Sequence, residues 1–136
     1  LLMATDAQLQ LIPTNETIPL GELLLQRPGY LRGKLITEVT LPLQARLAFH
    51  SAARTPADLP LVCAAVAKWS SGRLRVVTGG YGKAPIMVMD GAGAAGARVA
   101  AESAYGEAGD DRASAAYRRE VIGVLVERCL NDLDIG

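Results

Sequence analysis

The stretch DLPLVCAAVAKWSSGRLRVVTGG, residues 58–80, decides the fold of this chain. Within it, residues 61–69 form a nearly continuous apolar run, and residues 74–78 are rich in β-branched side chains. Residues 70–73 lie between the two runs and suit a tight turn, because Gly72 can take a positive φ. Two apolar runs separated by a short glycine-containing loop predict a β-hairpin.

Segments before the hairpin show the alternation of apolar and polar residues that is typical of strands. They are residues 6–11, 34–41 and 46–53, and residues 17–20 are expected to pair with the first of them. Residues 21–26 contain three successive leucines and are expected to form one helical turn. The connections from the third of these strands into the hairpin are short, so these strands are expected to pair antiparallel.

The chain after the hairpin is expected to be helical and to cover it. Residues 81–85 are predicted to form a loop, and the Gly/Ala-rich segment 91–97 a loop with a weak helix start. A helix is predicted at residues 98–105. Segment 91–97 does not directly follow a predicted strand and lacks Gly-x-Gly-x-x-Gly spacing, so it is not predicted to bind phosphate.

The last helix is predicted from about residue 112 to residue 130, where apolar residues recur every three or four positions. Arg118 and Arg119 fall outside its apolar face, and Asp110 and Asp111 are expected to cap its start. The face expected to be buried comprises Tyr117, Val121, Val124, Leu125 and Cys129.

These segments predict an α+β fold, in which a small antiparallel β-sheet of about three strands is covered by C-terminal helices. A partial β-rich tail precedes this sheet. A domain boundary is expected near residues 42–44, because Pro42 cannot donate a hydrogen bond to a β-ladder. The expected domains are therefore residues 1–43 and 44–136.

Composition and single residues exclude several functions. The 136 residues carry 14 basic and 14 acidic side chains, so no basic face for nucleic acid is predicted. No apolar run is long enough to span a membrane. Cys63 and Cys129 are expected to be free, buried thiols, which favours a cytoplasmic location. His50 is the only histidine, and neither a zinc ligand set nor a nucleophile elbow is present, so no self-contained catalytic or metal site is predicted.

Five segments carry patterns that occur together in one protein family. They are LLMATDAQLQL (1–11), TIPLGELLLQRPGYLRGKLITEVTLP (17–42), AFHSAARTPADLPLVCAAVA (48–67), RLRVVTGGYGKAP (73–85) and DDRASAAYRREVIGVLVERCL (110–130). In this order they resemble the C-terminal half of the FAD-binding (medium) subunit of the molybdenum hydroxylases, the family of carbon monoxide dehydrogenase and xanthine dehydrogenase. Because the chain begins with Leu1, it is expected to be a fragment of such a subunit.

The resemblance implies an electron-transfer role. Residues 1–43 would be the tail of a FAD-binding domain of the vanillyl-alcohol-oxidase type, and residues 44–136 would be the C-terminal domain of the subunit. The implied partners are a molybdenum-cofactor large subunit and an iron–sulfur small subunit, with electrons passing through FAD to an external acceptor. The segments that hold the FAD pyrophosphate in this family would lie upstream, so this chain alone is expected to bind FAD weakly or not at all and to be inactive.

Two flavin-contacting positions carry over from the resemblance. Ile36 matches the strand residue that meets the isoalloxazine, and His50 stands where the family has a lysine that approaches the flavin ring. Histidine carries a positive charge only part of the time near neutral pH, so a pH-dependent flavin potential is expected. Residues 86–96 lack the family's Pro-x-Arg-Ala pattern and regular helix, and an irregular segment is expected there.

An alternative reading is a non-catalytic module for subunit docking with a vestigial flavin site. The change at His50 and the irregular segment 86–96 favour it. Under either reading, the apolar faces of Leu9, Leu11 and residues 23–25 are expected to lack partners, so that the isolated chain self-associates.

Overall fold

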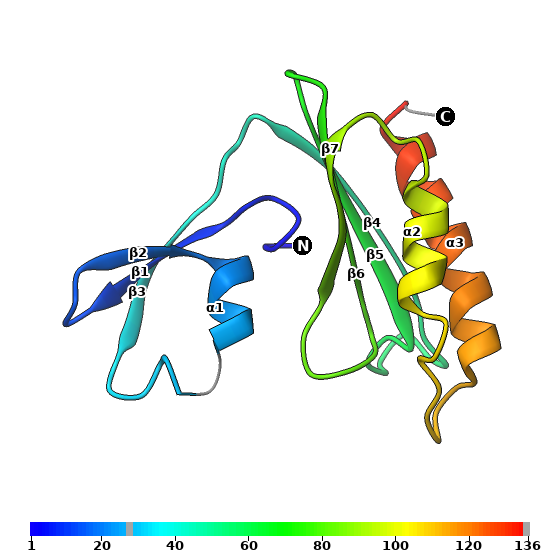
Figure 1. Cartoon of the computed structure of the whole chain (residues 1–136), viewed down its shortest axis with the longest axis horizontal. Helices are drawn as coiled ribbons and strands as arrows, with labels where there is room; N and C mark the ends of the chain where they lie inside the picture. The colour runs from blue at the N-terminus through cyan, green and yellow to red at the C-terminus, as the bar shows by residue number, and fades with distance from the viewer. Residues whose placement is uncertain (27–28, 135–136) are drawn as a thin grey trace.

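A computed structural model of the chain describes residues 1–26 and 29–134 and contains two antiparallel sheets and three helices (Figure 1). The first sheet has the order β2-β1-β3, with β1 at Gln8–Ile12, β2 at Glu16–Pro19 and β3 at Leu35–Thr40. The second sheet has the order β4-β5-β6-β7, with strands at Ala45–Ala52, Val62–Trp69, Arg73–Gly79 and Ile86–Ala92. The helices are α1 (Leu20–Gln26), α2 (Ala97–Ala104) and α3 (Ala115–Asp132). The predicted α+β class is confirmed.

The predicted hairpin is β5 and β6, at the centre of the second sheet. Its turn contains Gly72 at a φ of 86°, the conformation that glycine adopts without steric cost. The strands read as continuous apolar runs because both faces of the sheet are covered. Val62, Ala64 and Val66 pack toward the helices, whereas Ala65 and Ala67 pack against the N-terminal segment.

The helices α2 and α3 lie side by side on one face of the second sheet (Figure 1). Tyr105, which follows α2, donates a hydrogen bond of 2.9 Å from its hydroxyl to the carbonyl oxygen of Gly79. This bond joins the end of α2 to the end of β6 and satisfies a phenol that is otherwise buried. The core between helices and sheet includes Val62, Val66, Val76, Ile122, Val126 and Cys129.

The fourth strand of the second sheet, β7, occupies residues that were expected to be irregular or loop. Its run Ile-Met-Val-Met suits a pleated surface, and a bulge lies at Val76/Val77 on the partner strand. Asp90 is placed directly opposite Arg75, so an ion pair across the strands supports the pairing. The loop follows only after Ala92, where Gly93 and Gly96 take positive φ.

The start of α3 differs from the prediction. Ser114 is the N-cap, and its hydroxyl accepts a hydrogen bond of 3.2 Å from the amide of Tyr117. Asp110, expected as a cap with Asp111, instead accepts hydrogen bonds from the amides of Arg112 and Ala113 in the preceding loop. The expectation of an aspartate cap is therefore wrong, because the loop uses the Asp110 carboxylate for its own turn.

The buried face of α3 is also rotated relative to the expected one. Arg118 is fully buried, whereas Tyr117 is 43% and Val124 37% exposed. The rotation follows from the pairing of Arg118 with Asp110, which draws the guanidinium inward. Residues of α3 that are buried include Arg118, Ile122, Leu125, Val126 and Cys129.

The first sheet has a small core of its own. Leu9, Leu11 and Leu23 are buried together with Ile18, because α1 folds back over β1 and β2. The expectation that Leu9, Leu11 and Leu23 lack partners is therefore wrong, although Leu25 on the outer side of α1 is 87% exposed. Cys63 and Cys129 are free thiols, as expected, but only Cys129 is buried, whereas Cys63 is partly exposed. Among the described helices, none has the length and apolar character needed to cross a bilayer.

Candidate functional site

Exposed apolar side chains concentrate in one continuous segment, residues 35–49, which comprises β3, β4 and their connection. Both strands lie at an edge of their sheet, so one side of each backbone is unpaired within the described chain. We refer to the exposed side chains as the apolar segment: Leu35, Ile36, Val39, Leu41, Leu43, Leu47 and Phe49. These side chains lie on two sheets and on both faces of β3, so they form separate exposed faces, one with Ile36 and Val39 and another with Leu47 and Phe49.

The sequence-predicted Ile36 belongs to this segment. It lies opposite Leu11, and Val39 lies opposite Leu9, so both face the side of the first sheet that carries α1. Ile36 and Val39 are three residues apart and would point to opposite faces of a regular strand. A bulge where β3 pairs with Gln10 and Leu11 places both side chains on the same face. Ile36 stays 39% exposed because β3 is an edge strand, whereas Leu11 is buried.

The sequence-predicted His50 has a different environment. It lies on β4 with Ala48, which contributes to the core below the helices. Its Nε2 atom is 2.8 Å from Oδ2 of Asp132 in the last turn of α3. Ile36 and His50 thus lie on different sheets, and His50 is held by a carboxylate that the sequence did not associate with it.

The opposite face of β4 is apolar. Leu47 and Phe49 lie opposite Ala67 and Ala65, on the face against which the N-terminal segment packs. They are 40% and 42% exposed. Sequence reasoning did not select these two residues, although their alternation with Arg46, Ala48 and His50 was visible.

A cavity of about 570 Å³ lies between α1, the segment before β1, and the start of β7 with the loop that precedes it. Arg75 and Asp6 bring charge to it, and Glu22 of α1 also lines it. Its apolar wall includes Met3, Leu25, Pro85, Ile86 and Met87. Neither Ile36 nor His50 is among the residues that line this cavity.

Neither a metal-ligand cluster nor an activated thiol is found among the described residues. No three His, Cys, Asp or Glu side chains come together there as a metal site. Burial raises the pKa of the Cys129 thiol to about 11 and raises the pKa of Cys63 as well, so neither thiol is an activated nucleophile. The surfaces described above can bind a flat apolar group or a partner chain.

Comparison with known proteins places the fold. No family model matches the sequence, and no curated protein matches it. Among solved structures, the fold is that of the medium subunit of carbon monoxide dehydrogenase, which confirms at the level of the fold the resemblance to the molybdenum hydroxylases.

Three solved structures illustrate this likeness. A carbon monoxide dehydrogenase of Hydrogenophaga pseudoflava that lacks the Mo-pyranopterin moiety matches with a TM-score of 0.70 and 20% identity, over 96% of this chain and 53% of that one. Quinoline 2-oxidoreductase of Pseudomonas putida 86 matches with a TM-score of 0.68 and 16% identity, over 96% and 53%. Reconstituted CO dehydrogenase of Oligotropha carboxidovorans matches with a TM-score of 0.70 and 20% identity, over 96% and 54%. The chain spans about half the length of each matched chain.

Proposed function

We propose that this chain is the C-terminal half of the FAD-binding subunit of a cytoplasmic molybdenum-containing hydroxylase. Residues 1–43 form the tail of the FAD-binding domain, and residues 44–136 form the C-terminal domain. In the assembly, substrate is oxidised on a molybdenum-cofactor large subunit, and electrons pass from iron–sulfur clusters of a small subunit through FAD to an external acceptor. The fold likeness over 96% of the chain supports this proposal.

The observation that carries the flavin part of the proposal is the exposure of β3. All six of its residues are exposed, although Leu35, Ile36 and Val39 are apolar. An isoalloxazine is flat and aromatic, and the face with Ile36 and Val39 offers it an apolar surface. Bound FAD would supply the redox chemistry, and the chain would orient the ring and exclude water from it.

The phosphate half of FAD finds no comparable support here. Pyrophosphates are held by free backbone amides at helix starts and by basic side chains. The cations beside the apolar segment are engaged, since Lys34 pairs with Glu16 and Arg46 pairs with Asp134. This chain is therefore expected to bind the ring weakly and to need further polypeptide for the phosphates.

The test is the flavin content of a longer chain that contains this sequence, with the 136-residue chain as the control. We expect a flavin absorption spectrum from the longer chain and none from the short one after desalting. Ile36→Glu in the longer chain should lower the flavin content. Leu35→Glu, one residue away on the other face of β3, should leave it unchanged. Absence of flavin from the longer chain would overturn the proposal.

His50 has a second, separable part in the proposal. It would stand beside the flavin ring, the position that the resemblance gives to residue 50. Its Nε2 atom lies 2.8 Å from Oδ2 of Asp132. His50→Gln should change the flavin potential of the longer chain, and an unchanged potential would show that His50 has no such role.

The alternative function is a subunit-docking module with a vestigial flavin site, and it is favoured by the histidine at position 50 where the family has a lysine. In that case the apolar segment would bind protein and not the flavin ring. A longer chain without flavin that still assembles with its partner subunits would establish this alternative.

A further inference from the structure

Four charged residues connect the N-terminal part of the chain to the second sheet. Arg73 and Arg75 lie two residues apart on β6, so their side chains leave the same face of the sheet. Asp90 is directly opposite Arg75 on β7. Asp6 comes from the segment that precedes β1 and completes the group.

The hydrogen bonds of this group cross between the two parts of the chain. Arg75 places Nε at 3.0 Å and Nη2 at 2.8 Å from Oδ2 of Asp90. Its Nη1 lies 2.8 Å from Oδ1 of Asp6 and donates to the carbonyl oxygen of Met3 at 3.2 Å. Arg73 binds both carboxylate oxygens of Asp90, at 2.7 and 2.8 Å, and reaches Asp6 at 3.5 Å.

Burial makes these contacts specific. Arg75 is only 8% exposed, and burial of a guanidinium is costly unless its N–H groups have partners. The Arg73 guanidinium lies over the ring of Trp69, 4.9 Å from its centroid. Beside the charged group, Ala4 packs against Ala65, Ala67 and Val77. The junction is therefore a small apolar contact with a charged rim.

The backbone at Asp6 is held in an unusual conformation. Its φ is 62°, in the left-handed region that non-glycine residues seldom occupy. This geometry directs the carboxylate toward Arg73 and Arg75, and the Gln8 side chain donates to the Asp6 carbonyl oxygen. Strained backbone of this kind persists only where surrounding contacts over-determine it.

We infer that Asp6, Arg73, Arg75 and Asp90 form a clamp that fixes the N-terminal part against the second sheet and sets the width of the cavity between α1 and β7. Among the described residues, every ion pair and side-chain hydrogen bond between residues 1–40 and residues 45–134 passes through this clamp. Asp6 and Arg75 also line the cavity itself. The four residues are positioning residues, and their role does not depend on which ligand the apolar segment binds.

Asp6→Asn tests the clamp with little other change. Asparagine has the same shape as aspartate and tolerates the left-handed conformation, but it lacks the charge that holds both arginines. Trp69 is the only tryptophan of the chain and lies in the junction, so its fluorescence reports on this interface alone. Glu127→Gln is the matched control, because it removes an exposed carboxylate–arginine pair with Arg98 that lies on the helices and away from the clamp.

We expect Asp6→Asn to shift the Trp69 emission to longer wavelength and to increase its quenching by acrylamide. Amide hydrogen exchange over residues 1–7 should become about tenfold faster, and small-angle scattering should show a larger radius of gyration. Far-UV circular dichroism should not change. The control should match the wild type in all five measurements.

Unchanged quenching, exchange and radius in a folded Asp6→Asn variant would overturn the inference. If that variant does not fold, Arg73→Lys takes its place, because lysine keeps the charge but cannot hold Asp6 and Asp90 at once. It should show the same acceleration of exchange over residues 1–7 to a smaller degree. Wild-type exchange in a folded Arg73→Lys variant would also overturn the inference.

Discussion

Arg118 of α3 and Asp110 of the preceding loop form an ion pair in which one guanidinium nitrogen lies 2.8 and 2.9 Å from the two carboxylate oxygens. A second nitrogen of Arg118 donates to the carbonyl oxygen of Ala108 at 3.0 Å, and the guanidinium lies over the ring of Tyr81. A fully buried arginine thus ties the loop between α2 and α3 to the core. This relationship rotates α3 and decides which of its faces is buried.

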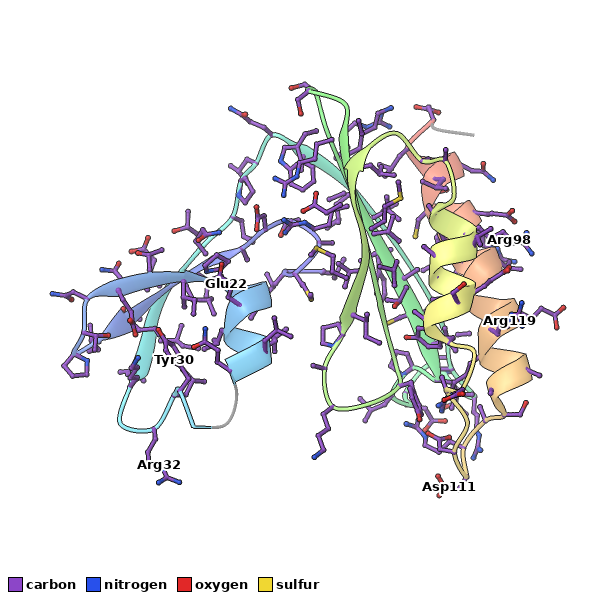
Figure 2. All side chains as sticks on the ribbon, viewed as in Figure 1. Glu22, Tyr30, Arg32, Arg98, Asp111 and Arg119 are labelled. Carbon is purple, nitrogen blue, oxygen red and sulfur yellow. The ribbon has the colours of Figure 1, made fainter. Side chains whose placement is uncertain are left out.

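Replacement of Arg118 by methionine should destabilise the fold. Methionine fills a similar volume, but it leaves the Ala108 carbonyl oxygen without its donor and removes the ion pair that joins the loop at Asp110 to α3. We expect a loss of about 2 kcal/mol in the free energy of unfolding, measured by urea denaturation. Arg119→Met is the control, since Arg119 points outward from α3 (Figure 2) and should be nearly neutral. Equal losses in both variants would contradict the role given to Arg118.

Gly80 should not tolerate a side chain. Its φ is 94°, and a Cβ there would lie 2.8 Å from backbone atoms of Leu61 and Val62, which cannot move aside easily. Gly80→Ala should therefore lower the free energy of unfolding by about 3 kcal/mol, since strain and overlap add. In Gly91→Ala the new Cβ meets open space and Gly91 has no positive φ, so the melting temperature should be unchanged or slightly higher. A wild-type melting temperature for Gly80→Ala would show that this close approach is absent.

The clamp should give the chain an acid-sensitive component of stability. Hydrogen bonds from Arg73, and then from Arg75, hold the pKa of Asp90 at about 2 against an ordinary value of 3.8. A carboxyl whose pKa is lowered in the fold stabilises it above its ordinary value and loses that contribution as pH falls through the lowered one. Asp90→Asn should therefore weaken the fold at pH 7 and flatten the loss of stability between pH 4 and pH 2.

Denaturation with urea at pH 7, 4 and 2.5 measures this effect. Asp111→Asn serves as the control, because Asp111 is exposed at the tip of its loop (Figure 2). It should follow the wild type at all three pH values. An unchanged acid profile in Asp90→Asn would show that the arginines do not stabilise the Asp90 carboxylate.

High pH should destabilise the fold through the thiol of Cys129. Burial raises the pKa of this thiol to about 11, whereas it ionises near 9 in an unfolded chain. Above pH 9 the unfolded chain therefore binds fewer protons than the folded one, and stability falls by up to about 1.4 kcal/mol per pH unit until the folded thiol ionises. Cys129→Ala should reduce this slope between pH 9 and pH 11. Cys63→Ala should reduce it less, because Cys63 is only partly buried; an equal slope in wild type and Cys129→Ala would contradict the prediction.

Local sequence patterns were sufficient for much of the fold. The central hairpin followed from a continuous apolar run, Gly72 and a β-branched run, because a strand covered on both faces needs apolar residues at every position. The strands β1, β3 and β4 followed from the alternation of apolar and polar residues, and β2 and α2 lie where a pairing strand and a helix were expected. Five patterned segments in order also identified the fold family, since their spacing reports the succession of elements.

Local patterns were not sufficient where a side chain depends on a partner far away in sequence. The strand β7 contains Asp90 and Gly91, two residue types that are typical of loops. Their place in a strand is explained only by their partners on β6, Arg75 and Leu74. The sequence pattern places Arg118 on the exposed face of α3, and only its ion pair with Asp110 explains why it is buried.

The sequence by itself therefore determined the class of fold, the central hairpin and the positions of most elements, because these depend on local periodicity and turn chemistry. Only the tertiary structure decided the buried face of α3, the fourth strand of the second sheet and the clamp from Asp6 to Arg73 and Arg75. The physical reason is that a charged or polar group is buried only when its partner is already in place. That partner can come from any part of the chain, and no local pattern indicates which one it is.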